Sequence, residues 1–250
     1  MWRTLDEAYQ YHCIRRRWKG FKQFMWWSCF SYEEKGPCHI WEEETAKEKK
    51  EAKEWMDEVN KLLEPHCRQE WELATGMRRL NIRRNLGGPK PKWRFSEKTS
   101  KLERKASKGG IDWYRYYKVI LEGKLLPFAK QCKAKRPGTI VQEDNASPHA
   151  HKHQHRVYNL WQIMRLLWPS NSPDLNAIEK CWFWMKRQTT KHGVASGVGQ
   201  MKKDWEECWA RLPQKKIQEW IEMIPGHIQR IIECEGGNEY REGSNPNRVR

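Results

Sequence analysis

Hydrophobic residues gather in short segments near the beginning of the chain. Residues 20–32 are aromatic and apolar, and the segment is short enough for a buried strand. Residues 33–37 combine charged residues with Gly and Pro, which indicates a turn. Residues 38–41 then fit a return strand, so the pattern predicts a β-hairpin.

The pattern becomes that of a charged helix over residues 42–63, where Glu, Lys and Ala dominate. Apolar residues recur there at helical spacing: Trp55, Val59, Leu62 and Leu63. Opposite charges stand four residues apart at Glu43/Lys47 and at Asp57/Lys61, which favours an exposed helix.

The second half of the chain alternates helical patterns with short apolar segments. Helices are predicted at residues 111–130 and 149–161, and two or three more fill residues 177–233. Strands are predicted at residues 139–143 and 163–168. Together with the hairpin, this order predicts an α/β or α+β domain with a mixed sheet.

Length and composition limit the class of protein. The 250 residues suffice for one large domain or two small ones, and sixteen Trp residues argue against disorder. No apolar run approaches the roughly 20 residues that a membrane span requires. The first residues lack the apolar core of a signal peptide, so a membrane protein and a secreted protein are both disfavoured.

The net charge of +16 is concentrated in residues 76–110, which hold twelve Lys and Arg against two Glu. Such a segment indicates a polyanionic partner, usually nucleic acid. The candidate contacts are Lys90, Lys92, Arg94 and Lys98, with Trp93 and Phe95 interleaved as rings that can stack on bases. The alternative is a solvated, flexible basic loop.

Cysteine and histidine give no specific metal signature. The eight Cys residues form no CxxC pair, which is typical of reduced, structural thiols in an intracellular protein and does not fit a zinc site. A run of alternate histidines (His149, His151, His153 and His155) has the spacing to bind a transition metal from a helix. We interpret the last three as surface residues.

Two acidic residues stand where carboxylates can meet. Asp144 follows the predicted strand 139–143, and Glu179 begins a predicted helix. Two or three carboxylates at one sheet edge can hold Mg²⁺ or Mn²⁺, which prefer oxygen ligands. The alternatives are an Asx turn at Asp144 and a capping box in which Glu179 pairs with Asn176.

The flanking residues form two longer motifs. One is Asp144-Asn145-Ala146 with His149, and the other is Trp168-Pro169 followed by the run from Ser172 to Glu179. Between Asp144 and Glu179 lie 34 residues. In these motifs and their spacing, and in the aromatic segment 24–32, the chain resembles the catalytic domain of DDE transposases of the mariner superfamily.

The resemblance implies a ribonuclease-H-like fold, a mixed sheet flanked by helices, and metal-dependent DNA cleavage and strand transfer. It implies that Asp144 and Glu179 are the second and third acidic ligands of a two-ion Mg²⁺ or Mn²⁺ site. Lys186 and Arg187, on the helix after Glu179, are candidate phosphate contacts. The implied partner is DNA, without a membrane, with a homodimer as in related transposases, and the implied location is the nucleus.

The pattern and the resemblance together predict a division of the chain. The pattern indicates a charged helix and basic insertion at residues 42–110 and a flexible tail at residues 236–250. The resemblance implies that residues 1–41 and 111–235 form the catalytic domain and that the insertion marks a eukaryotic branch.

The beginning of the chain departs from the family pattern. The first catalytic Asp and its strand normally precede a Trp-Arg segment, which here is Trp2-Arg3. Asp6 follows that segment and imitates the missing residue. We therefore expect an N-terminally truncated transposase that lacks its first strand and is inactive or nearly so. The alternatives are a non-catalytic nucleic-acid-binding relic that uses residues 76–110, and an unstable pseudogene product.

Overall fold

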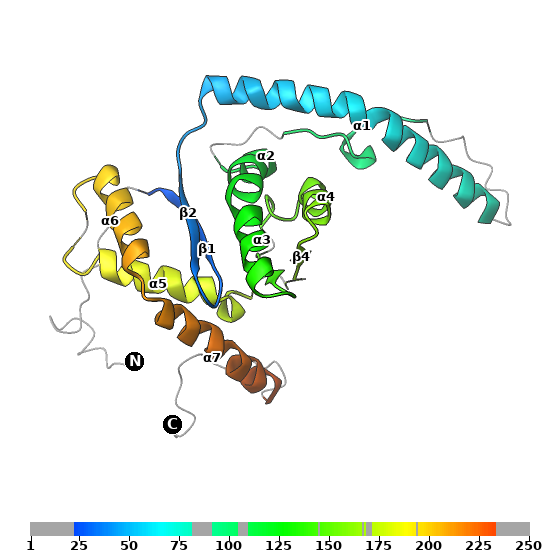
Figure 1. Ribbon diagram of the computed structural model, residues 1–250. Helices are drawn as coiled ribbons and strands as arrows, with labels where there is room; N and C mark the ends of the chain where they lie inside the picture. Colours follow the sequence, from blue (N-terminus) through cyan, green and yellow to red (C-terminus); the bar gives the residue numbers. More distant parts are fainter. Residues whose placement is uncertain are drawn as a thin grey trace, which may run out of the picture. The chain divides into compact units, whose positions relative to one another are not determined.

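The computed structural model describes residues 23–81, 92–104, 110–144, 146–166, 168, 172–193 and 195–233 (Figure 1). It is a mixed α/β structure with helices and two small sheets. The chain divides into two compact units. The first comprises residues 1–41, 124–145 and 162–250, and the second comprises residues 42–123 and 146–161. The domain boundaries predicted from the sequence stay a prediction.

The predicted hairpin is confirmed in the first unit. Strands β1 (Met25–Phe30) and β2 (Lys35–Trp41) pair antiparallel, with an irregularity between Ser28 and Phe30. The turn lies at residues 31–34, where the Ser31 amide donates to the Glu34 carbonyl at 2.8 Å. The predicted turn at residues 33–37 is therefore misplaced.

Close packing explains why Gly36 belongs to a strand. A Cβ atom at this position would lie 2.6 Å from the Cys29 sulfur and 2.8 Å from the Phe128 ring. The missing side chain thus admits close neighbours and does not serve a turn.

A second sheet contains β3 (Ile140–Val141) and β4 (Met164–Arg165), which pair parallel. The predicted strand at 139–143 is confirmed in a shorter form. The strand predicted at 163–168 is also confirmed in a shorter form, but its predicted burial is wrong, because Met164 and Leu166 are 64% and 42% exposed. The described strands form two separate two-stranded sheets, so the single mixed sheet stays a prediction.

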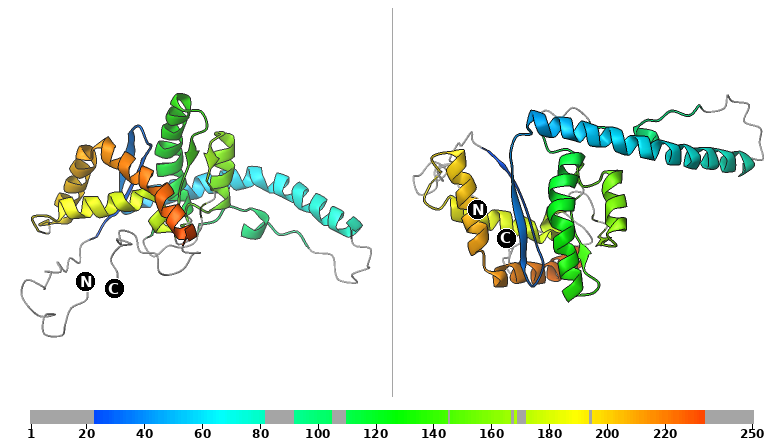
Figure 2. Two further views of the ribbon diagram at one scale, coloured as in Figure 1. Left: turned by 90° about the horizontal axis from the view of Figure 1, so that it is seen from below. Right: turned by 45° about the horizontal axis from the view of Figure 1, so that its top comes forward.

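Three helices form the core of the first unit, in agreement with the prediction for residues 177–233. They are α5 (Ala177–Thr189), α6 (Val198–Arg211) and α7 (Gln214–Glu233), and α5 packs against both others (Figure 2). The core includes Cys181, Met185, Leu212 and Ile217, all fully or almost fully buried. Of the tryptophans predicted to pack on helices, Trp209 and Trp220 are buried here and Trp182, Trp184 and Trp205 pack against them.

Lys35 joins the hairpin to the end of α6. Its Nζ donates hydrogen bonds to the carbonyl oxygens of Trp209, Ala210 and Leu212 at 3.0, 2.7 and 2.8 Å. A cation at a helix C-terminus satisfies carbonyls that have no partner within the helix. The contact fixes β2 against the helical core.

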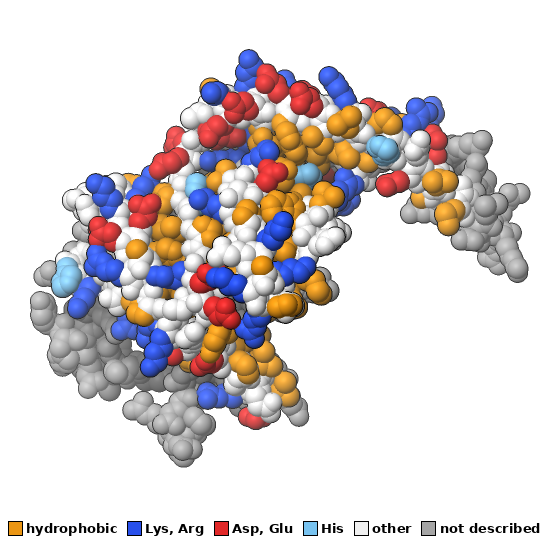
Figure 3. Space-filling model, in the orientation of Figure 1, with side chains coloured by type: hydrophobic (Ala, Val, Ile, Leu, Met, Phe, Trp, Pro, Cys, Tyr) orange, Lys and Arg blue, Asp and Glu red, His pale blue; other side chains and the backbone are white. Residues whose placement is uncertain are grey.

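The second unit is built on α1 (Ala46–Asn81), which runs well past the predicted end at residue 63. Thr45 and Glu48 form a reciprocal capping box at its start. The observed ion pairs are Lys47–Glu51, Lys50–Glu54 and Arg68–Glu72, and not the predicted Glu43/Lys47 and Asp57/Lys61. Charged side chains of both signs cover the upper side of α1 in Figure 3.

Shorter elements complete the second unit. They are η2 (Glu97–Thr99), α2 (Trp113–Arg115), most of η3 (Tyr116–Leu125) and α4 (Lys152–Leu160). With α3 (Leu126–Lys135) of the first unit, α2 and η3 confirm the predicted helix at 111–130. The helix predicted at 149–161 begins only at Lys152. Among the described helices, none is both long and apolar enough to cross a membrane.

Candidate functional site

Asp144 lies just beyond β3 and is exposed. The preceding residue, Glu143, is buried, and its carboxylate pairs with Arg165 of β4 at 3.1 Å. This ion pair ties the end of β3 to its neighbour, so it fixes the backbone from which Asp144 projects. The sequence analysis did not predict a role for Glu143 or Arg165. The two residues are 22 positions apart, so no local sequence pattern indicates that they form an ion pair.

Glu179 lies in the first turn of α5 and is half-buried. The capping box predicted with Asn176 is wrong, because the Asn176 side chain makes no cap hydrogen bond. The short helix η4 (Pro173–Leu175) leads into α5, and the Asn176 amide bonds back to the Pro173 carbonyl at 3.1 Å. The Glu179 amide is bonded to the Asn176 carbonyl at 3.0 Å, so the backbone provides the cap.

The two carboxylates interact electrostatically within the first unit. Burial raises the pKa of Glu179, the nearby Asp144 carboxylate raises it further, and Lys186 on the same helix lowers it. The end of β3 and the start of α5 therefore bring together the two acidic residues predicted as ligands. Among the described residues, however, no three Asp, Glu, His or Cys side chains form a group that could hold a metal ion. Asp6 lies outside the described residues.

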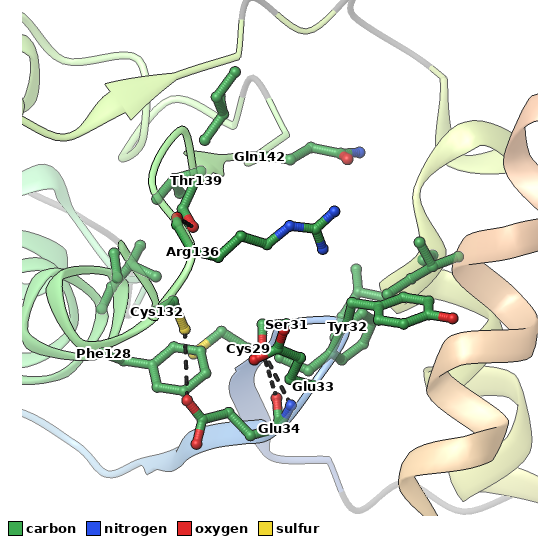
Figure 4. Close-up of a pocket in the computed structure, with 18 of the residues that line it drawn as sticks. Cys29, Ser31, Tyr32, Glu33, Glu34, Phe128, Cys132, Arg136, Thr139 and Gln142 are labelled. Carbon is green, nitrogen blue, oxygen red and sulfur yellow. Dashed lines mark hydrogen bonds between the residues drawn. The ribbon is translucent and has the colours of Figure 1, made fainter. Parts of the chain in front are cut away.

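A cavity of about 630 Å³ lies beside this acidic pair (Figure 4). Its walls include residues 140–142 of the β3 segment and residues 176–178 at the start of α5, and each wall is followed closely by one of the two carboxylates. Figure 4 shows Arg136 extending into the space between the hairpin turn and β3. The cavity thus contains a cationic side chain from the segment before β3.

Lys186 and Arg187 are both exposed on the last turns of α5. Neither forms an ion pair in the described part of the first unit. Lys186 is close enough to Glu179 to lower the pKa of that carboxyl. Both cations therefore remain available to an anionic partner.

The basic segment of the second unit is only partly available. Lys90 lies outside the described residues, whereas Lys92, Arg94 and Lys98 are exposed. Trp93 packs against Trp71 of α1 with ring centroids 5.7 Å apart, so this ring already has a structural use.

Arg104, another member of the basic segment, is enclosed. Its guanidinium donates to both oxygens of Glu44 at 2.7 and 2.9 Å and also pairs with Asp112. All three side chains are at most 15% exposed. Arg104 therefore holds the second unit together and is not a nucleic-acid contact.

The histidine run agrees with its prediction only in part, since His155 is exposed. His149 packs against Tyr116 with its ring tilted, and His151 stacks on Trp113. His153 was predicted at the surface, but its ring lies among Trp55, Trp113 and Tyr117, with centroids 5.7, 5.5 and 4.5 Å away. These aromatic neighbours come from three helices, since Trp55 belongs to α1, Trp113 to α2 and Tyr117 to η3.

Comparison with known proteins gives consistent matches. The profile described as DDE superfamily endonuclease matches residues 124–202. The Tcb1 transposase of Caenorhabditis briggsae is 30% identical over 60% of this chain and 54% of its own length. The Tc1 transposase of Caenorhabditis elegans is 31% identical over 48% of this chain and 43% of its own length. The chain thus spans about half the length of these relatives.

Among solved structures, the catalytic domain of Mos1 mariner transposase is similar at 18% identity, with a TM-score of 0.45. The match covers 53% of this chain and 65% of that chain. The profile and the relatives agree with the two motifs. Residues 124–202 therefore match a DDE superfamily endonuclease, the chain is similar to Tc1-type transposases, and the resemblance inferred from those motifs is confirmed.

Proposed function

We propose that this chain is the catalytic part of a transposase that cleaves DNA and transfers the cut strand. The observation that carries the proposal is the electrostatically coupled pair of Asp144 and Glu179. Both residues lie inside the matched segment 124–202. Around them, Lys186 and Arg187 offer positive charge to the phosphates of a DNA strand.

The donor set of this pair fits Mg²⁺ or Mn²⁺. Asp144 and Glu179 supply hard carboxylate oxygens, and their mutual repulsion favours a cation between them. When bound, a pair of such ions activates an attacking water or hydroxyl and stabilises the leaving oxygen of a phosphodiester. The Glu143–Arg165 ion pair holds the β3 end in place, so it acts as a positioning pair for Asp144.

We further propose a ribonuclease-H-like sheet, with residues 42–110 as an insertion. The described residues bring only two carboxylates together at this site, and two carboxylates bind a divalent ion more weakly than three, so we expect weak DNA cleavage. Metal binding is therefore the more sensitive test of the acidic pair.

The test uses Mn²⁺ titration and cleavage of the polypeptide by bound Fe²⁺ with peroxide. Asp144→Asn and Glu179→Gln should each abolish Mn²⁺ binding and remove Fe²⁺ cuts near residues 144 and 179. The matched control, Asp174→Asn, removes one nearby negative charge and should retain both signals. Equal loss in all three variants would mean that general charge holds the ion and would refute the site.

Plasmid nicking tests the activity itself. We expect little Mg²⁺- or Mn²⁺-dependent nicking from the 250-residue chain. Strong nicking that disappears in Asp144→Asn would contradict the proposed low activity while supporting the acidic pair as catalytic.

The second candidate is nucleic-acid binding without catalysis through residues 76–110. Lys92, Arg94 and Lys98 favour it, because all three are exposed and form no ion pair within the described residues. Neutralising Lys90, Lys92, Arg94 and Lys98 together should weaken binding to any duplex and flatten its salt dependence. Unchanged binding would refute this role.

Assembly and location follow from the same proposal. A homodimer should be visible by light scattering, and a DNA substrate implies a nuclear location. A monomer at micromolar concentration would count against the homodimer. A fluorescent fusion that is excluded from nuclei would count against the nuclear location.

A further inference from the structure

The second unit contains a cavity of about 670 Å³. Its lining comes from residues 97–103, from the start of α2 and from residues 147–156, all of which belong to this unit. The volume falls within the range of small-molecule sites, about 300–1,000 Å³. Neither the acidic pair nor its neighbouring cavity shares a lining residue with it.

Two structural contacts keep these walls in place. Asn60 of α1 holds the 97–103 loop by bonding both the amide and the carbonyl of Leu102, at 2.8 and 2.9 Å. Gln154 is fully buried and donates to the carbonyls of Trp113 and Pro148, both at 2.9 Å. The cavity is therefore bounded by segments that are fixed to one another.

Three cations from the described part of the chain surround the cavity. Lys98, Lys152 and Arg156 line it, are exposed and form no ion pair within the described residues. They come from two segments far apart in sequence, and only the fold places them around one space. Three unpaired cations at one cavity favour a ligand with more than one negative charge.

Three acidic residues line the cavity, Glu97, Glu103 and Asp112, and the last two are already neutralised. Glu103 pairs with Lys101 at 2.7 Å, and Asp112 pairs with Arg104. They therefore subtract little from the attraction that Lys98, Lys152 and Arg156 exert on an anion.

A fixed pair of flat rings forms part of the same wall. His151 stacks on Trp113 with centroids 4.3 Å apart and planes 8° from parallel. The Trp113 indole N–H donates to the Glu103 carbonyl at 2.9 Å, and His151 Nδ1 accepts from the His153 amide at 3.2 Å. Rings held in this way need no ordering before a base stacks on them.

We propose that this cavity binds an unpaired nucleotide of single-stranded DNA, with the base against the His151–Trp113 pair and the adjoining phosphates near the three cations. A duplex keeps its bases stacked inside, whereas a single strand can place a base in a hollow. The inference goes beyond strand cleavage and rests on the proposed function only for the choice of DNA as partner.

The first experiment measures the contribution of the cations by fluorescence anisotropy with a labelled dodecamer of thymidine. The full chain is used in EDTA, so that binding is measured apart from metal-dependent cleavage. The test variant carries Lys98→Gln, Lys152→Gln and Arg156→Gln. The control carries Lys49→Gln, Lys53→Gln and Lys61→Gln, which remove the same charge from exposed positions of α1.

The cavity variant should bind roughly tenfold more weakly, and the slope of log affinity against log salt should fall by about 2, or about 0.7 for each phosphate contact. The control variant should stay within about twofold of the unmodified chain. Equal weakening by both variants would mean general attraction and would overturn the proposal, as would an equal effect of the cavity variant on duplex DNA.

The second experiment isolates the base. The unmodified chain should bind the thymidine strand about tenfold more tightly than an abasic strand of the same length, the size expected for one stacked base. His151→Asn removes the ring but keeps a side-chain acceptor at the start of α4, and should bring that ratio close to one. An unchanged ratio would overturn the base contact. A uridine strand that binds more tightly than thymidine would assign the cavity to RNA and overturn the choice of DNA.

The outcomes separate this inference from the proposed function. If Asp144→Asn loses Mn²⁺ binding but keeps its affinity for the thymidine strand, the result supports the acidic pair and leaves the cavity unaffected. Strand binding that ignores the cavity variant refutes the cavity alone.

Discussion

Acid should unfold the second unit through His153. The ring lies among Trp55, Trp113 and Tyr117, and its Nε2 atom is buried without a hydrogen-bond partner. Burial lowers the pKa of His153 from 6.5 to about 4, and the cations Arg156 and Lys118 and the neighbouring His151 lower it in the same direction. Glu122 is the opposing charge.

The sign follows from where the proton binds. Below pH 6.5 the unfolded chain binds a proton at His153, whereas the folded chain stays neutral there until the pH approaches 4. The contribution of neutral His153 to the free energy of unfolding is therefore fully present above about pH 6.5 and is lost as the pH falls toward 4. A shift of this size corresponds to about 3 kcal/mol of unfolding free energy.

The perturbation that tests this is His153→Phe, which keeps a ring among the aromatic side chains and removes the titrating group. Hydrogen exchange of peptides from η3 and α4, followed by mass spectrometry between pH 7.5 and 4.5, reports on the second unit separately. His155→Gln is the control, because that histidine is exposed.

The unmodified chain and the His155→Gln control should lose about 2.5 kcal/mol more protection than His153→Phe over this interval, which ends just above the folded pKa. Exchange is compared after correction for the intrinsic pH dependence of the amide rate. If His153→Phe and the unmodified chain lose the same protection, the buried imidazole does not control the acid response and the reasoning fails.

Three further predictions concern packing and buried charge, each measured by urea unfolding. Lys35→Met should cost about 2 kcal/mol, since it leaves carbonyls at the end of α6 without a donor. Arg104→Met should cost about 3–5 kcal/mol, because Glu44 then remains buried without its partner, and adding Glu44→Gln should recover part of the loss. Gly36→Ala should cost about 1–3 kcal/mol through its clash with neighbours, whereas Gly76→Ala in α1 meets nothing within 4 Å and should stabilise by roughly 0.5–1 kcal/mol. Equal effects of the two glycine changes would refute the close-packing argument.

Elements with a strong local pattern were predictable from the sequence. The hairpin was found because two apolar segments flank a turn, and the helices after residue 177 because their apolar residues keep a helical period. The end of α1 was not predictable in this way. Pro65 stands inside the helix, and the continuation past it includes a buried Cys67 and the contact of Trp71 with Trp93. Such contacts between distant segments override a local helix-breaking signal.

The candidate acidic pair was predictable because its residues belong to motifs with a characteristic spacing. Its surroundings were not predictable. Glu143 and Asp144 are adjacent acidic residues in the sequence, yet one is buried against Arg165 and the other is exposed. Successive side chains near a strand end point in different directions, and only the partner strand decides which carboxylate is neutralised. The assignment of Asp144 and Glu179 as metal ligands stays a prediction.

The number of charges in the basic segment 76–110 likewise did not predict which of its cations are available to a polyanion. By composition its twelve cations are equivalent, but Arg104 is enclosed by two carboxylates and Lys101 pairs with Glu103. Lys98 instead faces a cavity whose other unpaired cations come from α4, some fifty residues further along the chain. The surface that can attract a polyanion is thus composite, because folding neutralises part of the segment and adds cations from outside it. A variant that neutralises all cations of the segment would therefore change both folding and binding, because it removes structural ion pairs such as that of Arg104. A variant that neutralises only Lys98, Lys152 and Arg156 tests binding at the cavity.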